Sequence, residues 1–259
     1  MAETWQASEM MTIAAARALR NHDVCFVGIG LPSAAANLAR LTHAPSITLI
    51  YESGTIATKP DVLPLSIGDG ELCETALTTT TVVEMFRYWL QGGRMSVGFL
   101  GGAQIDRFAN LNTTVIGPYE KPKTRLPGGG GAPEIASACG EIFIIMNQSP
   151  RSFVEKLDFV TSMGHGEGGD HRARLGLATK GPTKLITDLC IFEPDPASKE
   201  MTVTSVHPGV SRDRIAANTG WPARFAAHLT ETPAPTDSEL KTLRDLKART
   251  ARAHGQRSE

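Results

Sequence analysis

The chain has 259 residues, of which 41% are hydrophobic and 20% are charged, and its net charge is −1. This balance gives no electrostatic case for nucleic acid or an anionic membrane as the main partner, and no apolar run approaches the ~20 residues of a membrane span. The stretch MAETWQASEMM has no basic region followed by an apolar core, so we expect no export signal. Four widely spaced cysteines, three of them in apolar segments, indicate buried thiols in a reducing cytoplasm.

The first fifth of the chain predicts a strand, a glycine turn, a helix and a second strand. Apolar residues at helical spacing predict a helix over residues 8–20 before this unit. The run at 24–30 predicts a buried strand that ends in glycine, and residues 31–41 predict a helix with Pro32 near its start. The next strand is predicted at 46–51. This order is typical of a parallel βαβ unit and therefore of an α/β protein.

The rest of the chain continues the alternation of strands and helices. A helix that ends in glycine is predicted at 81–93, and a glycine loop that leads into a short helix at 127–140. Thr236 and Glu239 match a capping box before a charged C-terminal helix. We therefore expect one α/β domain over 1–259, with a multi-layer, open and mainly parallel sheet flanked by helices. Further strands are predicted at 96–102, 110–117, 141–147, 184–192 and 201–207.

The stretch ITLIYESG, residues 47–54, ends a buried strand in a carboxylate, Glu52. Gly28 and Gly30 follow the preceding strand, and Glu52 lies about 20 residues further on, which is close to the dinucleotide-binding fingerprint. The third glycine position of that fingerprint holds Ser33, so the match is incomplete. Glu52 is also compatible with a plain solvated acid at a strand end.

A third interpretation makes Glu52 a nucleophile. A carboxylate is a weak nucleophile, so it would need an activated acyl group such as a thioester. The strand end is a rigid mounting, and Gly54 permits close approach of a substrate. Attack on a thioester creates an oxyanion that needs N–H donors, and the glycine run 128–131 before a helix is a candidate source. A flexible loop is an equally good interpretation of that run.

Four motifs resemble, in this order, the β subunit of family I coenzyme A transferases: VGIGLP at 27–32, YESG at 51–54, LQGGRMSVGFLGGAQIDRFANLNTTVIG at 90–117 and GGGGAPEIA at 128–136. The stretches SIGDGEL, FRYWLQGGR and GHGEGGDHR are similar to the branch of that family that acts on 3-oxoadipate, and the glutaconate branch is also similar. The resemblance implies a coenzyme A transferase fold, coenzyme A (CoA) as a substrate, and neither a metal nor a tightly bound cofactor. It also implies an α subunit, an α2β2 assembly and a cytoplasmic location.

The resemblance implies a role for Glu52 as the catalytic residue that carries CoA as a glutamyl thioester, with succinyl-CoA as donor and 3-oxoadipate as acceptor. The family signature around this acid is Ser-Glu-Asn-Gly, whereas this chain has Tyr51 and Ser53 in the flanking positions. The oxyanion hole maps onto Gly130 and Gly131. Possible contacts with CoA or substrate are Gly28, Gly30, Ser53, Gly54, Gln104, Asn112, Gly128, Gly129 and Lys123. The alternatives are transfer to glutaconate or another dicarboxylate, acyl-CoA hydrolysis or ring cleavage with Glu52 as a base, and a non-catalytic scaffolding subunit.

Two further groups of polar residues have a structural and a functional interpretation. The GHGEGGDHR loop lacks the fixed spacing of strong metal motifs, so we favour a glycine-rich loop with polar contacts over a metal site. The basic residues before the glycine run either pair with CoA phosphates or form a solvated face. We expect Asp106 and Arg107 to brace the structure. The possible metal ligands are His165, Glu167, Asp170 and His171, and the basic residues are Lys121, Lys123 and Arg125.

Overall fold

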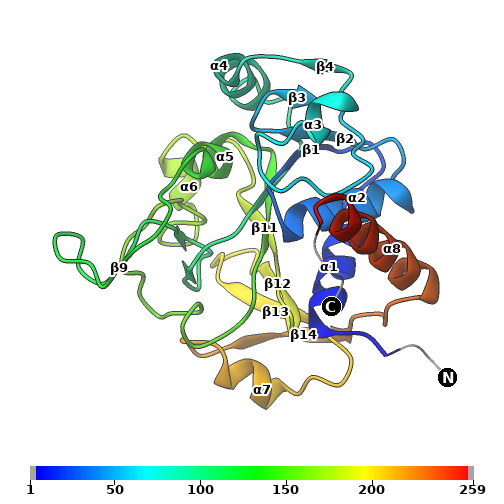
Figure 1. Ribbon diagram of the computed structural model, residues 1–259. Coiled ribbons are helices and arrows are strands. Elements are labelled where there is room, and N and C mark those ends of the chain that lie inside the picture. The colour runs from blue at the N-terminus through cyan, green and yellow to red at the C-terminus, as the bar shows by residue number, and fades with distance from the viewer. Residues whose placement is uncertain (1–3, 256–259) are drawn as a thin grey trace. The chain divides into compact units, whose positions relative to one another are not determined.

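The computed structural model describes residues 4–255 (Figure 1). The chain divides into two compact units. The first unit runs to Phe99 and includes the C-terminal segment from Ala234, and the second unit is Leu100–Pro233. Each unit contains strands and helices. The expectation of one coenzyme A transferase domain over the whole chain stays a prediction.

The first unit contains five strands in the order β5-β1-β2-β3-β4. The pairs at its centre are parallel, because β1 lies between β2 and β5 and runs in the same direction as both. The pairs at its edge are antiparallel, with β3 between β2 and β4. The register pairs Val27 with Tyr51, so β1 and β2 end at the same level. The bounds are β1 Val24–Val27, β2 Thr48–Tyr51, β3 Thr55–Ile56, β4 Thr78–Thr79 and β5 Val97–Leu100.

The helices α1, α2 and α8 follow the predictions, the helix predicted at 81–93 differs in geometry, and α3 was not predicted. Small alanine side chains line the buried faces of α1 and α2, which pack against each other. The helix predicted at 81–93 begins as an α-helix and continues as a π-helix over Met85–Leu90. Residues five apart share a face in a π-helix, and both Met85 and Leu90 are fully buried. The bounds are α1 Ala7–Ala18, α2 Leu31–Leu41, α3 Glu71–Glu74, α4 Val82–Glu84, η1 Met85–Leu90 and α8 Asp237–Ala253.

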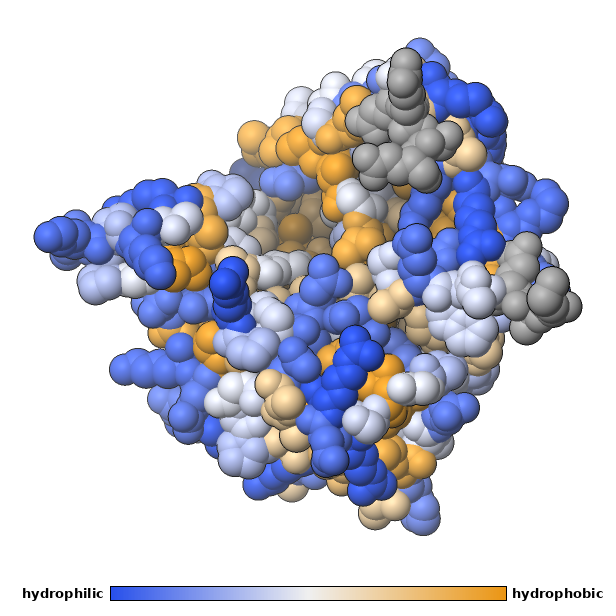
Figure 2. Space-filling model, turned by 60° about the horizontal axis from the view of Figure 1, so that its bottom comes forward, coloured by the Kyte–Doolittle hydropathy of each residue, from blue (hydrophilic) through white to orange (hydrophobic). Residues whose placement is uncertain are grey.

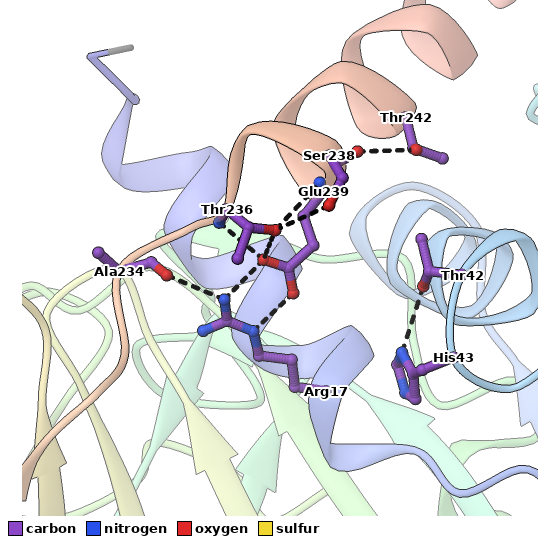
Figure 3. A network of polar contacts seen from close by, with 8 residues as sticks. All are labelled: Arg17, Thr42, His43, Ala234, Thr236, Ser238, Glu239 and Thr242. Atoms are coloured by element: carbon purple, nitrogen blue, oxygen red, sulfur yellow. Dashed lines mark hydrogen bonds and ion pairs between the residues drawn. The ribbon is translucent and has the colours of Figure 1, made fainter. Parts of the chain in front are cut away.

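The C-terminal helix α8 is fastened to α1 by the network drawn in Figure 3. The predicted capping box is confirmed, because Thr236 Oγ1 accepts from the Glu239 amide at 3.3 Å and the Glu239 carboxylate accepts from the Thr236 amide at 2.8 Å. Arg17 of α1 donates two hydrogen bonds to the same carboxylate, at 2.7 and 2.6 Å. Burial alone would raise the pKa of Glu239, but these hydrogen bonds outweigh burial and lower it to about 2.

The second unit contains five strands in the order β14-β13-β12-β11-β10. The pairs β10/β11 and β13/β14 are parallel, and the other two pairs are antiparallel. The prediction of one strand over 184–192 is wrong, since this run forms parts of β11 and β12. Thr187 makes the turn between them by accepting at Oγ1 from the amides of Leu189 and Cys190. The bounds are β10 Glu141–Ile145, β11 Pro182–Ile186, β12 Cys190–Pro194, β13 Met201–Val206 and β14 Arg224–Glu231.

Two small hairpins and three short helices complete the second unit. The strand predicted at 110–117 is divided between the two hairpins. The loop before β9 projects at the left of Figure 1, and the corresponding projection in Figure 2 is mainly hydrophilic. The bounds are β6 Gln104–Ile105, β7 Leu111–Asn112, β8 Val115–Ile116, β9 Thr124–Arg125, α5 Ala132–Ala138, α6 His171–Arg174 and α7 Arg212–Ala217.

The cysteines agree with their sequence interpretation. Cys25, Cys139 and Cys190 are buried and Cys73 is exposed, and none of the four forms a disulfide within the described residues. Within residues 4–255, none of the helices has the length and hydropathy needed to span a membrane.

Candidate active site

Glu52 begins the tight turn that joins β2 to β3 in the first unit. The amide of Gly54 donates to the carbonyl of Tyr51 at 3.0 Å and closes this turn. The Glu52 side chain is partly buried, whereas Tyr51 before it is fully buried. The prediction of a carboxylate at the end of a buried strand is confirmed, and the turn gives this carboxylate a short, hydrogen-bonded mounting.

Gly54 holds this turn against the neighbouring strand. It adopts a φ of +101°, and a Cβ atom added there would lie 2.0 Å from the carbonyl oxygen of Thr80. The amide of Thr80 also donates to the Gly54 carbonyl at 2.9 Å. Glycine is therefore required by the packing of the chain itself. The hydroxyls of Ser53 and Thr55 on either side are buried and have no hydrogen-bond partner among the described residues.

A buried polar network lies directly behind the turn. The Tyr51 hydroxyl is 2.7 Å from Ser33 Oγ, and Asn37 Nδ2 donates to that hydroxyl at 3.4 Å. Burial raises the pKa of Tyr51 to about 12, so this phenol stays protonated at neutral pH. Ser33 and Asn37 belong to α2, so the network ties that helix to the residue next to Glu52.

Ser33 explains why the dinucleotide fingerprint is incomplete in this chain. It stands where the fingerprint has its third glycine, and its hydroxyl is used within the protein to hold Tyr51. Gly28 and Gly30 form the turn between β1 and α2. Because β1 and β2 end at the same level, this turn and the Glu52 turn share the carboxyl edge of the parallel strands, where α/β proteins bind ligands.

The glycine loop before α5 presents a row of backbone amides in the second unit. The amide of Gly128 donates to Thr113, and the carbonyl of Gly129 accepts from the amide of Ala132. The amides of Gly129, Gly130 and Gly131 have no acceptor within the described part of the chain. Successive unpaired N–H groups are the donors from which an oxyanion site is built.

Gln104 and Asn112 support the glycine loop through buried hydrogen bonds beside it. Asn112 is fully buried and donates to Gln104 Oε1 and to the Val115 carbonyl, both at 2.7 Å. Gln104 donates in turn to Asp158 at 2.9 Å. The turn that follows Asn112 receives the glycine loop, since the carbonyl of Thr113 accepts from the amide of Gly128 at 2.8 Å. Both amide side chains are thus engaged with the protein and hold the loop in place.

The GHGEGGDHR loop uses its polar side chains for internal hydrogen bonds. His165 Nε2 is 2.7 Å from the carbonyl of Pro182, and His171 Nδ1 accepts from the amide of Glu167 at 2.8 Å. Asp170 forms an ion pair with Arg174 at 3.0 Å. Over residues 4–255, no group of three or more His, Cys, Asp and Glu side chains is arranged to hold a metal ion.

The basic residues before the glycine loop divide into two kinds. Arg125 lies 4.7 Å over the ring of Tyr119 and donates to its carbonyl at 3.0 Å, so it stabilises the projecting loop. Lys121 and Lys123 are exposed, and neither ammonium group has an ion-pair partner in the described structure.

The expectation for Asp106 and Arg107 is confirmed. The Asp106 carboxylate accepts hydrogen bonds from the amides of Phe108 and Asn110 and from the Asn110 side chain. Arg107 forms an ion pair with Glu155 at 3.4 Å. Both residues brace the loop after β6.

Comparison with known proteins shows the family to which the chain belongs. Residues 8–218 match the coenzyme A transferase family. The chain is 66% identical to the β subunit of 3-oxoadipate CoA-transferase of Pseudomonas knackmussii over 97% of both chains, and 35% identical to the β subunit of glutaconate CoA-transferase of Acidaminococcus fermentans over 92% of this chain and 90% of that one. The crystal structure of glutaconate coenzyme A-transferase from Acidaminococcus fermentans superposes with a TM-score of 0.88 at 33% identity, covering 94% and 95% of the two chains.

The chain therefore belongs to the coenzyme A transferase family, whose members use CoA as a substrate. The resemblance to β subunits of this family, the α/β fold with a mainly parallel sheet and the expectation of a CoA-transferase enzyme are confirmed. The roles of the individual site residues stay predictions. Sequence reasoning missed the Ser33–Tyr51–Asn37 network, although the serine in a glycine position and the tyrosine beside Glu52 were visible signals.

Proposed function

We propose that this chain is the catalytic β subunit of an enzyme that transfers CoA from succinyl-CoA to 3-oxoadipate through a thioester on Glu52. The observation that carries the proposal is the position of Glu52, a partly buried carboxylate on a closed turn at the carboxyl edge of parallel strands. The acceptor acid is taken from the relative that is 66% identical over nearly the whole of both chains.

The reaction proceeds in four balanced steps. A carboxylate oxygen of Glu52 attacks the thioester carbonyl, the carbon–sulfur bond breaks, and a mixed anhydride and the CoA thiolate form. The thiolate attacks the Glu52 carbonyl and releases succinate, which leaves CoA on Glu52 as a thioester. The carboxylate of 3-oxoadipate then attacks this thioester and frees the thiolate again. The thiolate finally attacks the carbonyl of 3-oxoadipate in the new anhydride and restores the Glu52 carboxylate.

Each attack creates a negatively charged oxygen that needs hydrogen-bond donors. We assign this role to the amides of Gly130 and Gly131, because both lack an acceptor within the described residues and follow one another in the chain. Gln104 and Asn112 act in this proposal by holding the glycine loop, since their side chains bond to the protein. The free energy of the thioester is conserved through the cycle, because each carbon–sulfur bond that breaks is formed again in the next step, so the chemistry requires neither ATP nor a metal ion.

The remaining candidate contacts differ in the group that they offer. The turn with Gly28 and Gly30 lies on the same edge as Glu52, and Ser53 offers a hydroxyl that has no partner among the described residues. Gly54 acts in this proposal by letting the turn pack against Thr80, which holds Glu52 in place. Gly128 and Gly129 extend the glycine loop, and Lys123 offers an unpaired ammonium group for a phosphate of CoA.

We further propose that an α subunit completes the enzyme as an α2β2 assembly in the cytoplasm. The segment from Leu65 to Tyr88 supports a partner surface, because six of its large apolar residues are 44–81% exposed. They are Leu65, Ile67, Leu77, Val82, Val83 and Tyr88. The relative from Pseudomonas knackmussii is itself one subunit of its enzyme, and cysteines that form no disulfide within the described residues fit a reducing compartment.

An acceptor screen with the two purified subunits tests the assignment. Succinyl-CoA is supplied with 3-oxoadipate, glutaconate or acetate, and each new acyl-CoA is quantified. The proposal predicts that kcat/KM is largest for 3-oxoadipate. A preference for glutaconate would contradict the assigned acceptor. Loss of succinyl-CoA at the same rate without any acceptor would show a hydrolase instead.

A further inference from the structure

A second polar site lies in the Leu100–Pro233 unit, at the opposite end of α5 from the glycine loop. It is an open depression of about 470 Å³. The polar and charged side chains that line it are His165, Asp170, Arg172, Thr179, Lys180 and Lys199. Its volume falls within the range of small-molecule sites. Arg172 of α6 lines the depression and donates to the carbonyl of Ala136 in the second half of α5 at 3.2 Å. The helices α5 and α6 are neighbours in Figure 1.

Arg172 brings a buried positive charge that no carboxylate neutralises. It is 7% exposed, and its guanidinium donates to the carbonyl of Gly164 at 2.8 Å and to Thr179 Oγ1 at 2.7 Å. All of its acceptors, including the carbonyls of Ala136 and Thr179, are uncharged. Burying a charge is unfavourable unless an opposite charge compensates it. The depression therefore favours an anion.

Two lysines add to this charge. Lys180 and Lys199 both line the depression, and neither ammonium group has a hydrogen bond or an ion pair with a described residue. The acid at this site, Asp170, is already paired with Arg174 at 3.0 Å. Burial, with smaller contributions from the charges of Arg172 and Lys199, lowers the pKa of His165 to about 4. His165 is thus neutral at pH 7, and the net charge of the site is positive.

The backbone around Lys199 is fixed in an unusual conformation. Lys199 has a φ of 62°, a left-handed conformation that side-chain-bearing residues adopt rarely. Its turn is tied to the GHGEGGDHR loop, because the amide of Gly169 donates to the carbonyl of Ser198 at 2.9 Å. The two segments meet so closely that a Cβ atom on Gly168 would lie 2.6 Å from that carbonyl oxygen. The glycines of the loop thus allow it to approach the turn that carries Lys199.

We propose that this depression is a phosphate-binding site in which Lys180 and Lys199 contact the phosphate group and Arg172 supplies fixed positive charge behind them. None of its residues takes part in the chemistry at Glu52, and the case in which CoA supplies the phosphate rests on the proposed function. Phosphate matches the site because its oxygens accept several charge-assisted hydrogen bonds at once. The phosphate group comes either from free inorganic phosphate or from the 3′-phosphate of CoA.

Titration calorimetry of the full chain with inorganic phosphate tests the site. The dissociation constant should rise about tenfold or more in the Lys180→Gln/Lys199→Gln variant, because two charge-assisted contacts are lost. The matched control, Lys156→Gln, removes an exposed lysine outside the depression and should leave the constant unchanged. Absence of phosphate binding to the unmodified chain, or equal binding to both variants, would overturn the proposal.

A charge-conserving variant separates loss of charge from damage to the fold. Lys180→Arg/Lys199→Arg should keep phosphate binding within about threefold of the unmodified chain, since the positive charges remain. Loss of binding in this variant as large as in the glutamine variant would also contradict the proposal.

Titration with CoA and with 3′-dephospho-CoA identifies the source of the phosphate. If the ligand is CoA, the glutamine variant weakens binding of CoA and leaves binding of 3′-dephospho-CoA unchanged, and CoA displaces inorganic phosphate. If the ligand is free phosphate, the affinity for CoA is the same in all variants and CoA does not displace phosphate. Both outcomes support a phosphate site, and they assign it to different ligands.

Discussion

The turn that carries Glu52 and the loop 128–131 position reactive groups in opposite ways. At Glu52 the side chain is the reagent, and the backbone around it is closed by hydrogen bonds to Tyr51 and Thr80. At the glycine loop the functional groups are backbone amides, which have no acceptor in the described residues. The buried side chains of Gln104 and Asn112 hold this loop in place. A reactive side chain can thus be recognised in the sequence from its residue type. Backbone amides that are available as donors can be recognised only in the structure, because they lack an acceptor there.

The largest expected effect follows from removing the reactive side chain. Glu52→Gln keeps the shape of the residue and removes the anionic nucleophile, so kcat should fall by about 10⁴-fold or more, the order seen when a nucleophile is lost. Steady-state assays with the α subunit measure this change. The control is Glu74→Gln, which alters an exposed acid of the same unit. Activity in Glu52→Gln within tenfold of the unmodified enzyme would leave Glu52 without a catalytic role.

A smaller effect is expected from removing one amide of the loop. Gly131 has a φ of −82°, which proline tolerates, and its amide has no acceptor within residues 4–255. Gly131→Pro should therefore lower kcat by about 10²–10³-fold, the loss typical of one oxyanion donor. Gly131→Ala keeps the amide and serves as the control. Equal activity of the two variants would exclude this amide from the oxyanion site.

The network behind Glu52 should matter mainly for stability and geometry. Tyr51→Phe removes the hydroxyl that Ser33 and Asn37 contact, so the free energy of unfolding should fall by about 1–2 kcal/mol. The double variant Ser33→Ala/Tyr51→Phe lacks both partners of the closest contact. Adding Ser33→Ala to Tyr51→Phe should therefore lower the free energy of unfolding by less than Ser33→Ala lowers it in the unmodified protein. Denaturant titrations of the four proteins measure the coupling. Strictly additive losses would show that the contact contributes nothing.

The smallest effect concerns the attachment of α8 to the unit that carries Glu52. The pKa of Glu239 lies at about 2, below its ordinary value of 4.5. A depressed pKa stabilises the folded state above pH 4.5, and this contribution is lost as the pH falls toward 2. We expect the free energy of unfolding to fall by about 1–3 kcal/mol across that range. This fall should be absent from Glu239→Gln and should remain in the control Asp237→Asn, as denaturant titrations at each pH would measure. An unchanged pH profile in Glu239→Gln would contradict the role of the Arg17 contact.

The elements that sequence predicted well are those whose signal is local. The helix over 31–41, the strand end at Glu52 and the capping box at Thr236 each depend on neighbours within a few residues. The run at 184–192 resembles one strand because its turn is made by the Thr187 hydroxyl, with neither glycine nor proline to mark it. β14 was not predicted, since most of its residues are exposed and show no regular alternation.

The same limit applies to the site. Glu52 could be predicted from its place after an apolar run, and the ordered motifs supplied its interpretation. The support of the glycine loop could not be predicted, because Gln104 bonds to Asp158, which lies 54 residues further along the chain. The charge of the depression around Arg172 depends likewise on lysines and carbonyls brought together from separate segments.

Mass spectrometry of the chain after reaction with succinyl-CoA tests whether Glu52 carries CoA as a thioester. The purified subunits are mixed with succinyl-CoA without an acceptor, digested, and searched for a peptide that carries CoA. We predict that CoA is attached at Glu52 and that addition of 3-oxoadipate removes it. A CoA adduct on any other residue, or turnover without an adduct on this chain, would contradict the account.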